Sequence, residues 1–328
     1  MEKPKRRFGD RYDGYLIRNC DPLFQLIPCI MRTRTDAMVY FDYDLDITGL
    51  EKFVRLHRAT DIPNLRMLHI FMAAMVRVIS QMPHLNRFVS GKKIYARNEI
   101  RIAMTAKRSL TLDGEENNIM PEFEPEDTLY DVVEKVEKAL EEEIFTTGEG
   151  SADGSYAVAS VLGAIPTGIK SGFVNLMRGL DQIGKMPKLI HRASPFHASM
   201  YITDLGSCGI GPVFHHLYEF GTCSCFVAMG KKETRYVVNA KGEVETRRYI
   251  GVKIVVDERV CDGFYYAYAM KTMTRLIRHP ERLLTPPEQV MPDDGIHKPK
   301  KPRRKKLAAQ AAEAAPKGEA EREPVAAQ

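Results

Sequence analysis

The stretch LRMLHIFMAAMVRVISQM, residues 65–82, restricts the possible folds more than any other part of the chain. A helix built from it carries apolar side chains on nearly every side, and such a helix belongs in the interior of a protein. Pro83 helps to end the helix, because proline cannot continue the pattern of backbone hydrogen bonds. The chain must therefore bury a substantial core, and its 328 residues are enough for one large domain or two ordinary ones.

Strand patterns lie on both sides of this helix in the sequence. The apolar alternation in 37–50 predicts a strand with a helix-starting turn near Thr48-Gly49. Further strands are expected as a pair within 92–108, over 197–206, over 223–230, and as two runs around the Lys241-Gly242 turn within 234–258. Helices are expected over 127–144, over 263–279 and in parts of 156–192, with a loop at 145–155. This order indicates a single α/β domain with a mixed β-sheet flanked by helices.

Charge is distributed unevenly along the chain. Lys and Arg are concentrated in 1–11 and 298–306, while 113–143 is acidic, so the net charge of +5 says little about what the folded body binds. We expect 1–19 to form a basic N-terminal arm and 293–328 a disordered tail, first basic and then Ala/Glu-rich. No aromatic residue interleaves the seven positive charges of KPKKPRRKK, which favours a solvated tail over a nucleic-acid site.

The same reading addresses the cellular compartment and metal sites. No secretory signal is recognisable at the start. The longest apolar stretch, 156–169, is short for a membrane span and contains Pro166. None of the six cysteines forms a CxxC pair, which predicts reduced thiols, a cytoplasmic protein and no metal site.

The segment VVDERVCDGFYYA, residues 255–267, is the most specific motif. An apolar run ends in two acids and an arginine, and an Asp-Gly pair then leads into an aromatic helix. It resembles the His-x-x-x-Asp-Gly signature of the chloramphenicol acetyltransferase-like fold, which also forms the catalytic domain of the 2-oxoacid dehydrogenase (dihydrolipoamide) acyltransferases. Three further stretches resemble the family in order and spacing, and with the motif they cover roughly 20–290, although 145–195 fits poorly: FDYDLDITGLEKF, MPHLNRFVSGKKIYARNEIRIAM and YITDLGSCGIGP.

This resemblance implies a fold and an activity. It makes 20–292 an acyltransferase-like catalytic domain, assembled as a homotrimer with active sites between subunits. Acyl-CoA is then the co-substrate, no cofactor is covalently bound, and a thiol or hydroxyl acceptor attacks the thioester after a histidine takes its proton. A serine or threonine hydroxyl supports the oxyanion, and the aspartate of Asp-Gly forms an ion pair that holds the site.

The resemblance carries over residue by residue. Asp262 and Gly263 match the Asp-Gly pair, and Asp262 is expected to pair with Arg18 or Arg32, to cap the helix that begins at Gly263, or both. Thr203 stands at the position of the oxyanion hydroxyl, although a strand threonine can equally reflect β propensity. The structural residues implied around these two positions are Leu205, Gly206, Gly263 and Arg259.

Glu258 departs from the family pattern, because it occupies the position of the catalytic histidine. Imidazole, with a pKa near ~6.5, exchanges protons at neutral pH, whereas an ordinary glutamate, near ~4.3, is a weak base for a thiol. Burial away from cations could raise that pKa, but Asp257 and Arg259 act in opposite senses.

Three hypotheses follow for the missing histidine. Glu258 is the working base of an altered transferase; the fold is catalytically silent and serves ligand binding or assembly; or another histidine replaces the lost one. His197, His215 and His216 are the candidates for that replacement. No lipoyl or subunit-binding domain fits into 1–19, so a dihydrolipoamide acceptor is expected to be presented by another, lipoyl-bearing protein.

Overall fold

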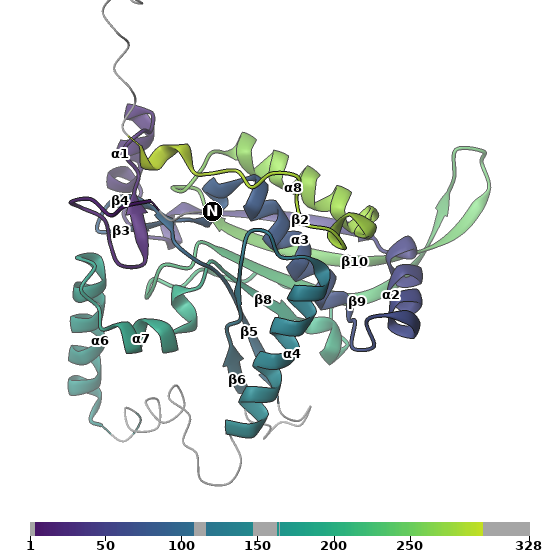
Figure 1. Cartoon of the computed structure of the whole chain (residues 1–328), viewed down its shortest axis with the longest axis horizontal. Coiled ribbons are helices and arrows are strands. Elements are labelled where there is room, and N and C mark those ends of the chain that lie inside the picture. The colour runs from purple at the N-terminus through teal and green to yellow at the C-terminus, as the bar shows by residue number, and fades with distance from the viewer. Residues whose placement is uncertain (1–3, 108–115, 147–162, 164, 298–328) are drawn as a thin grey trace, which may run out of the picture.

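The computed structural model describes residues 4–107, 116–146, 163 and 165–297. Its centre is a seven-stranded sheet with the strand order β2-β10-β9-β8-β5-β6, in which β7 also pairs with β5 (Figure 1). β8 runs parallel to both β5 and β9, and the other pairings are antiparallel. The sheet is therefore mixed, as predicted from the sequence. Its strands are β2 (Met38–Asp46), β5 (Ile100–Lys107), β6 (Glu116–Ile119), β7 (Glu122–Phe123), β8 (Met200–Asp204), β9 (Cys225–Val238) and β10 (Val244–Asp257).

One face of this sheet carries the main core. The buried helix predicted at 65–82 is α3 (Met67–Gln81), and every residue from His69 to Ser80 is buried. α3 packs between α8 (Gly263–Arg278) and α4 (Leu129–Thr146), and α2 (Thr48–Thr60) contacts α3 and α8. Alternate residues of β2 and β10 point into this layer, as the period of two in a strand requires.

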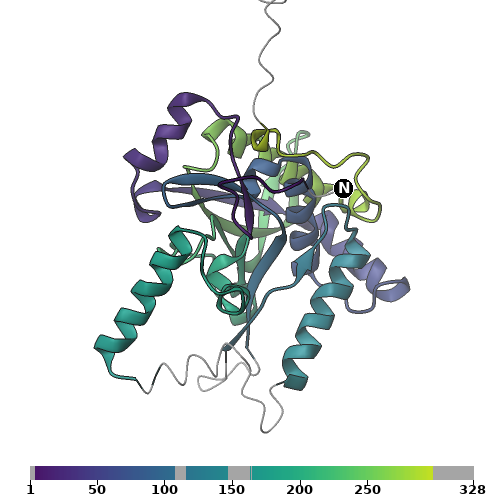
Figure 2. The same cartoon turned by 60° about the vertical axis from the view of Figure 1, so that its left-hand side comes forward.

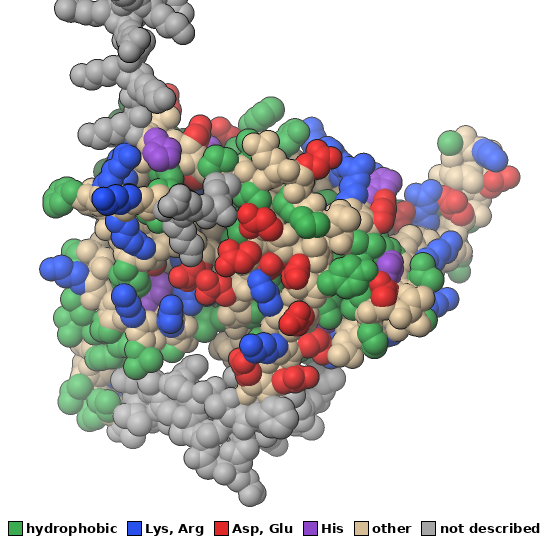
Figure 3. Space-filling view, in the orientation of Figure 1, with side chains coloured by type: hydrophobic (Ala, Val, Ile, Leu, Met, Phe, Trp, Pro, Cys, Tyr) green, Lys and Arg blue, Asp and Glu red, His purple; other side chains and the backbone are tan. Residues whose placement is uncertain are grey.

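Two other helices lie on the opposite side of the sheet. α6 (Thr167–Gln182) stands across the central strands from α4 (Figure 2), and the short α7 (Lys188–Ala193) follows it. Exposed apolar side chains gather over α6 and the turn behind it (Figure 3), among them Ile169, Leu176, Ile183 and Leu189. The helical part expected within 156–192 is present, and most of the loop expected at 145–155 lies outside the described residues.

A second, three-stranded sheet has the order β1-β4-β3. It consists of β1 (Gly14–Leu16), β3 (Arg87–Ser90) and β4 (Lys93–Arg97), and α1 (Pro22–Ile30) lies beside it. The predicted strand pair within 92–108 is thus β4 and β5, which belong to different sheets. No element was predicted at β1, β3 or α1, because β1 and β3 are only three and four residues long and α1 contains Pro28.

Both predicted chain ends are partly built into the domain. Arg11 and Asp13 are buried and paired at 2.7 Å, so the arm expected over 1–19 includes structural residues. At the other end, Asp293 pairs with Arg87 at 2.6 Å, and the carbonyl of Gly295 accepts hydrogen bonds from Arg18 and Asn19. Residues 293–295 of the expected tail are therefore in contact with the domain, and 298–328 lies outside the described residues.

β9 and β10 form a hairpin that projects far beyond the body (Figure 1). The two separate strands expected at 223–230 and after residue 234 are one continuous strand, β9. Near the tip of the hairpin, Tyr236, Val238 and Val244 are about three-quarters exposed. All six cysteines are free, and no helix in the described part of the chain is long and apolar enough to cross a membrane.

Candidate active site

The motif at 255–267 begins at the end of a central strand. β10 is hydrogen-bonded to β2 on one side and to β9 on the other, and its last residue is Asp257. The Asp257 carboxylate is fully buried and accepts two hydrogen bonds from the Arg259 guanidinium, at 2.8 and 2.7 Å. Arg34 Nε lies 3.4 Å from the same carboxylate. The motif is therefore fixed by a buried ion cluster around Asp257.

Glu258 follows this carboxylate in a turn and is half-buried. Its backbone N–H donates to the carbonyl of Ala37 at 2.9 Å, which ties the turn to the start of β2. The two charged neighbours that act in opposite senses on Glu258, Asp257 and Arg259, are bound to each other and compensate one another. Glu258 is thus held by its backbone beside the buried ion cluster of Asp257, Arg259 and Arg34.

Asp262 caps the following helix. Its carboxylate accepts a hydrogen bond from the Tyr265 N–H at 2.8 Å, which satisfies one of the free donors in the first turn of α8. Among the described residues of one copy, Asp262 has no ion-pair partner, and Arg18 pairs with Asp10 at 2.8 Å. Asp257, not Asp262, has the buried arginine partners. A Cβ added at Gly263 would meet nothing within 4 Å.

Thr203 lies near the end of β8, on the sheet face opposite α3. It is half-buried and pairs with Ala228 of β9. The turn after it, η4 (Leu205–Cys208), begins with Leu205 and needs a glycine at 206, because an added Cβ would lie 2.7 Å from the Gly230 carbonyl. This crowding holds the end of β8 against β9 and fixes the position of Thr203.

One copy of the chain keeps Thr203 and Glu258 apart. Thr203 is level with Ala228, which is level with Lys253, and Glu258 lies five residues further along the chain. At about 3.3 Å per residue and about 4.8 Å between strands, roughly 15–20 Å separates the two residues. A single copy therefore cannot place both on one small reacting group.

Part of the sequence and the fold of the chain are similar to those of known acyltransferases. Residues 192–285, which include Thr203 and Glu258, match the model of the 2-oxoacid dehydrogenases acyltransferase (catalytic domain) family. A probable dihydrolipoamide acetyltransferase from Listeria monocytogenes 4b F2365 superposes with a TM-score of 0.50 at 12% identity, covering 80% of this chain and 93% of that chain. Dihydrolipoamide acetyltransferase from Azotobacter vinelandii has a TM-score of 0.50 at 16% identity, covering 75% and 84%. The chain has the predicted acyltransferase fold.

A chloramphenicol acetyltransferase is a more distant structural neighbour, with a TM-score of 0.47 at 8% identity, covering 79% of this chain and 96% of that chain. No curated protein sequence matches the chain.

The three histidines proposed as replacement bases occupy different places in the acyltransferase fold. His197 is fully buried, and burial outweighs Asp181 in lowering its pKa to about 4, so it has no access to a substrate. His216 is exposed. His215 stacks on Phe226 at 3.8 Å, on the sheet face that carries Thr203, and burial lowers its pKa. His215 is thus partly accessible and lies on the face of the oxyanion candidate.

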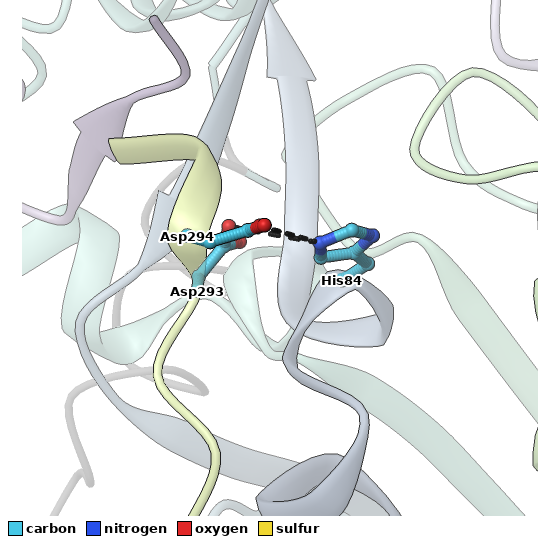
Figure 4. Close-up of side chains that lie close together, drawn as sticks. All are labelled: His84, Asp293 and Asp294. Atoms are coloured by element: carbon cyan, nitrogen blue, oxygen red, sulfur yellow. Dashed lines mark hydrogen bonds and ion pairs between the residues drawn. The ribbon is translucent and has the colours of Figure 1, made fainter. Parts of the chain in front are cut away.

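In the described part of the chain, one cluster has the composition of a metal site: His84, Asp293 and Asp294 (Figure 4). His84 Nε2 lies 3.3 Å from an Asp294 oxygen. The Asp293 carboxylate, however, already accepts two hydrogen bonds from Arg87, at 2.7 and 2.6 Å. A guanidinium bound to that carboxylate repels a second cation. The cluster is therefore better explained as a contact that holds the 290–297 segment on the domain than as a metal centre.

Proposed function

We propose that this chain is a CoA-dependent acyltransferase that moves an acyl group from acyl-CoA to a thiol or hydroxyl acceptor. The observation that carries the proposal is the placement of Glu258 at the end of β10, with Asp262 as the cap of α8, within the span that matches the acyltransferase family. Residues 20–292 are the catalytic domain in this proposal, and acyl-CoA is a freely dissociating co-substrate.

The Azotobacter vinelandii enzyme supports the assignment of roles. Crystallographic and enzymatic work on that protein concerns a serine, a histidine and an asparagine in its catalytic mechanism, and the histidine and asparagine are four residues apart. Glu258 and Asp262 have the same spacing, and Thr203 supplies a hydroxyl at a comparable distance before them. We assign Glu258 as the base, Thr203 as the oxyanion donor and Asp262 as the residue that sets the start of α8.

The proposed reaction uses these groups in order. The Glu258 carboxylate takes the proton of the acceptor S–H or O–H, and the freed sulfur or oxygen attacks the thioester carbon of acyl-CoA. Thr203 donates a hydrogen bond to the tetrahedral oxyanion, a contact that typically lowers the barrier by a few kcal/mol. The C–S bond to CoA then breaks, and the proton passes from Glu258 to the CoA sulfur.

The separation of Thr203 and Glu258 supports an active site made by two copies, and we propose a homotrimer. The β9–β10 hairpin extends into solvent with exposed apolar residues, and a two-stranded ribbon is marginally stable without a packing partner. The exposed apolar face of α6 offers a second contact area (Figure 3). Gly263, which has open space around it in one copy, is then adjacent to the neighbouring copy or the substrate.

Other parts of the proposal rest on chemistry. Six free thiols favour a cytoplasmic location. A dihydrolipoamide acceptor would arrive on a separate lipoyl-bearing protein, and a small free acceptor is the alternative. A catalytically silent subunit for ligand binding or assembly is the competing function, and the observation that favours it is the glutamate itself, because an unperturbed carboxylate is a weak base at neutral pH.

Formation of CoA and S-acetyldihydrolipoamide from acetyl-CoA and dihydrolipoamide, separated by chromatography, tests the proposal. The unaltered chain should turn over, and Glu258→Ala should abolish turnover while Glu258→His retains or raises it. Thr203→Val should lower turnover about 100-fold or more if its hydroxyl serves the oxyanion. Silence of the natural chain with activity gained in Glu258→His would identify a silent fold. Turnover that survives Glu258→Ala but is lost in His215→Ala would transfer the role of base to His215.

A further inference from the structure

A small cavity lies beside the ion cluster that fixes Glu258. Its volume is about 160 Å³, and its inner wall includes Arg259, the residue after Glu258, together with Arg34. Five separate parts of the chain meet around it: the segment after α1, the β3–β4 turn, α6, the loop before β9 and the turn after β10. Its charged lining is predominantly basic and consists of Arg32, Arg34, Lys92, Arg178 and Arg259, with the acids Asp181 and Glu219.

The backbone turn that places Lys92 at this cavity has an uncommon conformation. Gly91 and Lys92 form the two-residue turn between β3 and β4, with φ values of 54° and 61°. Both residues therefore adopt the left-handed conformation, which a residue with a side chain such as lysine rarely takes. A Cβ on Gly91 would lie 2.5 Å from the Gln182 carbonyl, so the turn sits directly on the end of α6. This contact brings Lys92 and Arg178 to the same opening.

The two acids of the lining are already engaged. One Glu219 oxygen accepts hydrogen bonds from the N–H and the hydroxyl of Thr35, at 2.7 and 2.9 Å. Asp181 pairs with Arg11 at 2.7 Å and faces His197 at 3.6 Å. Asp181 is therefore paired outside the group of cavity cations, whereas Glu219 also interacts with Arg34, whose charge lowers its pKa.

The five cations divide into two sets. Arg34 and Arg259 are buried and share the Asp257 carboxylate, and Arg34 also donates to the carbonyls of Tyr218 and Gly221. Arg32, Lys92 and Arg178 are exposed at the opening, and their side chains have no hydrogen-bond or ion-pair partner among the residues that the structure describes. Like charges that converge on one cavity repel each other, and an anion between them removes that repulsion.

We propose that this cavity binds the anionic head group, a carboxylate or a phosphate, of a small free acyl acceptor, the alternative to dihydrolipoamide. The cavity is large enough for such a head group. Arg259, the residue after Glu258, lines the cavity, so we assign the bound anion to the reactant that gives its proton to Glu258. In acyl-CoA the phosphates are separated from the thioester by the whole pantetheine arm. The assignment to the acceptor rests on the proposed function, whereas anion binding itself does not.

Direct binding to the full-length chain tests the site. Inorganic phosphate and succinate are titrated by calorimetry at low ionic strength, where surface charges are least screened. Arg178→Gln should weaken both anions about tenfold, as expected for the loss of one charge-assisted contact. Lys92→Asn should do the same while keeping a residue that tolerates the left-handed turn. Lys241→Gln, at the remote tip of the β9–β10 hairpin, removes the same charge and should change nothing. Absence of anion binding, or equal binding in all variants, overturns the inference.

Two donor ligands separate the sources of the anion. If the acceptor supplies it, CoA and dephospho-CoA, which lacks the 3′-phosphate, should bind Arg178→Gln as tightly as the unaltered chain. Selective loss of CoA affinity in Arg178→Gln would assign the cavity to the donor and overturn the acceptor assignment. Anion binding without acyl transfer in any assay would refute the proposed function and leave the anion site standing. Acyl transfer without anion binding would do the reverse.

Discussion

Replacing Asp257 by asparagine should destabilise the protein more than any other change in the DERVCDG motif. The Asp257 side chain is 1% exposed, and the Arg259 and Arg34 side chains that face it are 4% and 5% exposed. Asparagine has nearly the same shape, so packing is retained and only the charge is lost. Two buried guanidinium groups then lack their carboxylate.

The magnitude follows from this burial. Removing one partner of a buried ion pair costs about 3–5 kcal/mol, because the remaining charge stays desolvated. Arg34 keeps its hydrogen bonds to the Tyr218 and Gly221 carbonyls, so we expect the lower part of that range, about 3 kcal/mol. A folded domain is stable by about 5–15 kcal/mol, and the variant should therefore fold with a much reduced margin.

Urea unfolding at neutral pH, followed by circular dichroism, measures this loss. Asp262→Asn is the matched control, because Asp262 is exposed and asparagine caps a helix as well as aspartate does; its unfolding free energy should change by less than about 0.5 kcal/mol. A loss below about 1 kcal/mol in Asp257→Asn would refute the reasoning, since it would mean that water compensates the two arginines.

Three further outcomes are expected. Gly91→Ala should cost at least about 2 kcal/mol in urea unfolding, because its Cβ would lie 2.5 Å from the Gln182 carbonyl at a φ of 54°; an unchanged midpoint would contradict that contact. Gly263→Ala should gain about 0.5–1 kcal/mol in an isolated copy, since its Cβ has open space in a helix, and a loss would point to a neighbour at that position. Burial lowers the pKa of His197 and of His69 to about 4, below the unfolded value near 6.5. The unfolded chain then binds these protons first, so stability is full above about pH 6.5 and falls toward pH 4, by up to about 1.4 kcal/mol per pH unit for each histidine. Unfolding midpoints measured between pH 4 and 7 check this fall, and His69→Gln should roughly halve the slope.

The sequence predicted those elements whose pattern is long and local. α3 was predictable because apolar residues cover every side of fifteen residues, and the β9–β10 hairpin because a Lys-Gly turn separates two alternating runs. β1 and β3 were missed because three or four residues carry no recognisable period, and their strand form depends on β4 lying between them. The continuity of β9 was missed because the charged residues Lys231–Glu233 interrupt the apolar pattern, and their strand form depends on pairing with β10.

Some features of the candidate site can likewise be recognised in the sequence, and others depend on the fold. The Asp-Gly pair, the hydroxyl at Thr203 and the glutamate at 258 are visible in one dimension, because each stands at a fixed offset from a strand end or a turn. Which of the three carboxylates at 257, 258 and 262 becomes the buried ion-pair partner is not visible. They are chemically alike, and the answer depends on Arg34, which is more than 200 residues away along the chain.

The sequence by itself determined the α/β class, the strand-to-helix motif and the chemical types available at its turn, because these depend on neighbours within a few residues. The tertiary structure alone decided that Asp257 is the charge held by arginines, that Thr203 and Glu258 lie too far apart to act in one copy, and that Arg32, Lys92 and Arg178 converge on one cavity. Each of those facts is a distance between residues far apart in the chain. Burial and electrostatic interaction depend on such distances, and a linear pattern does not contain them.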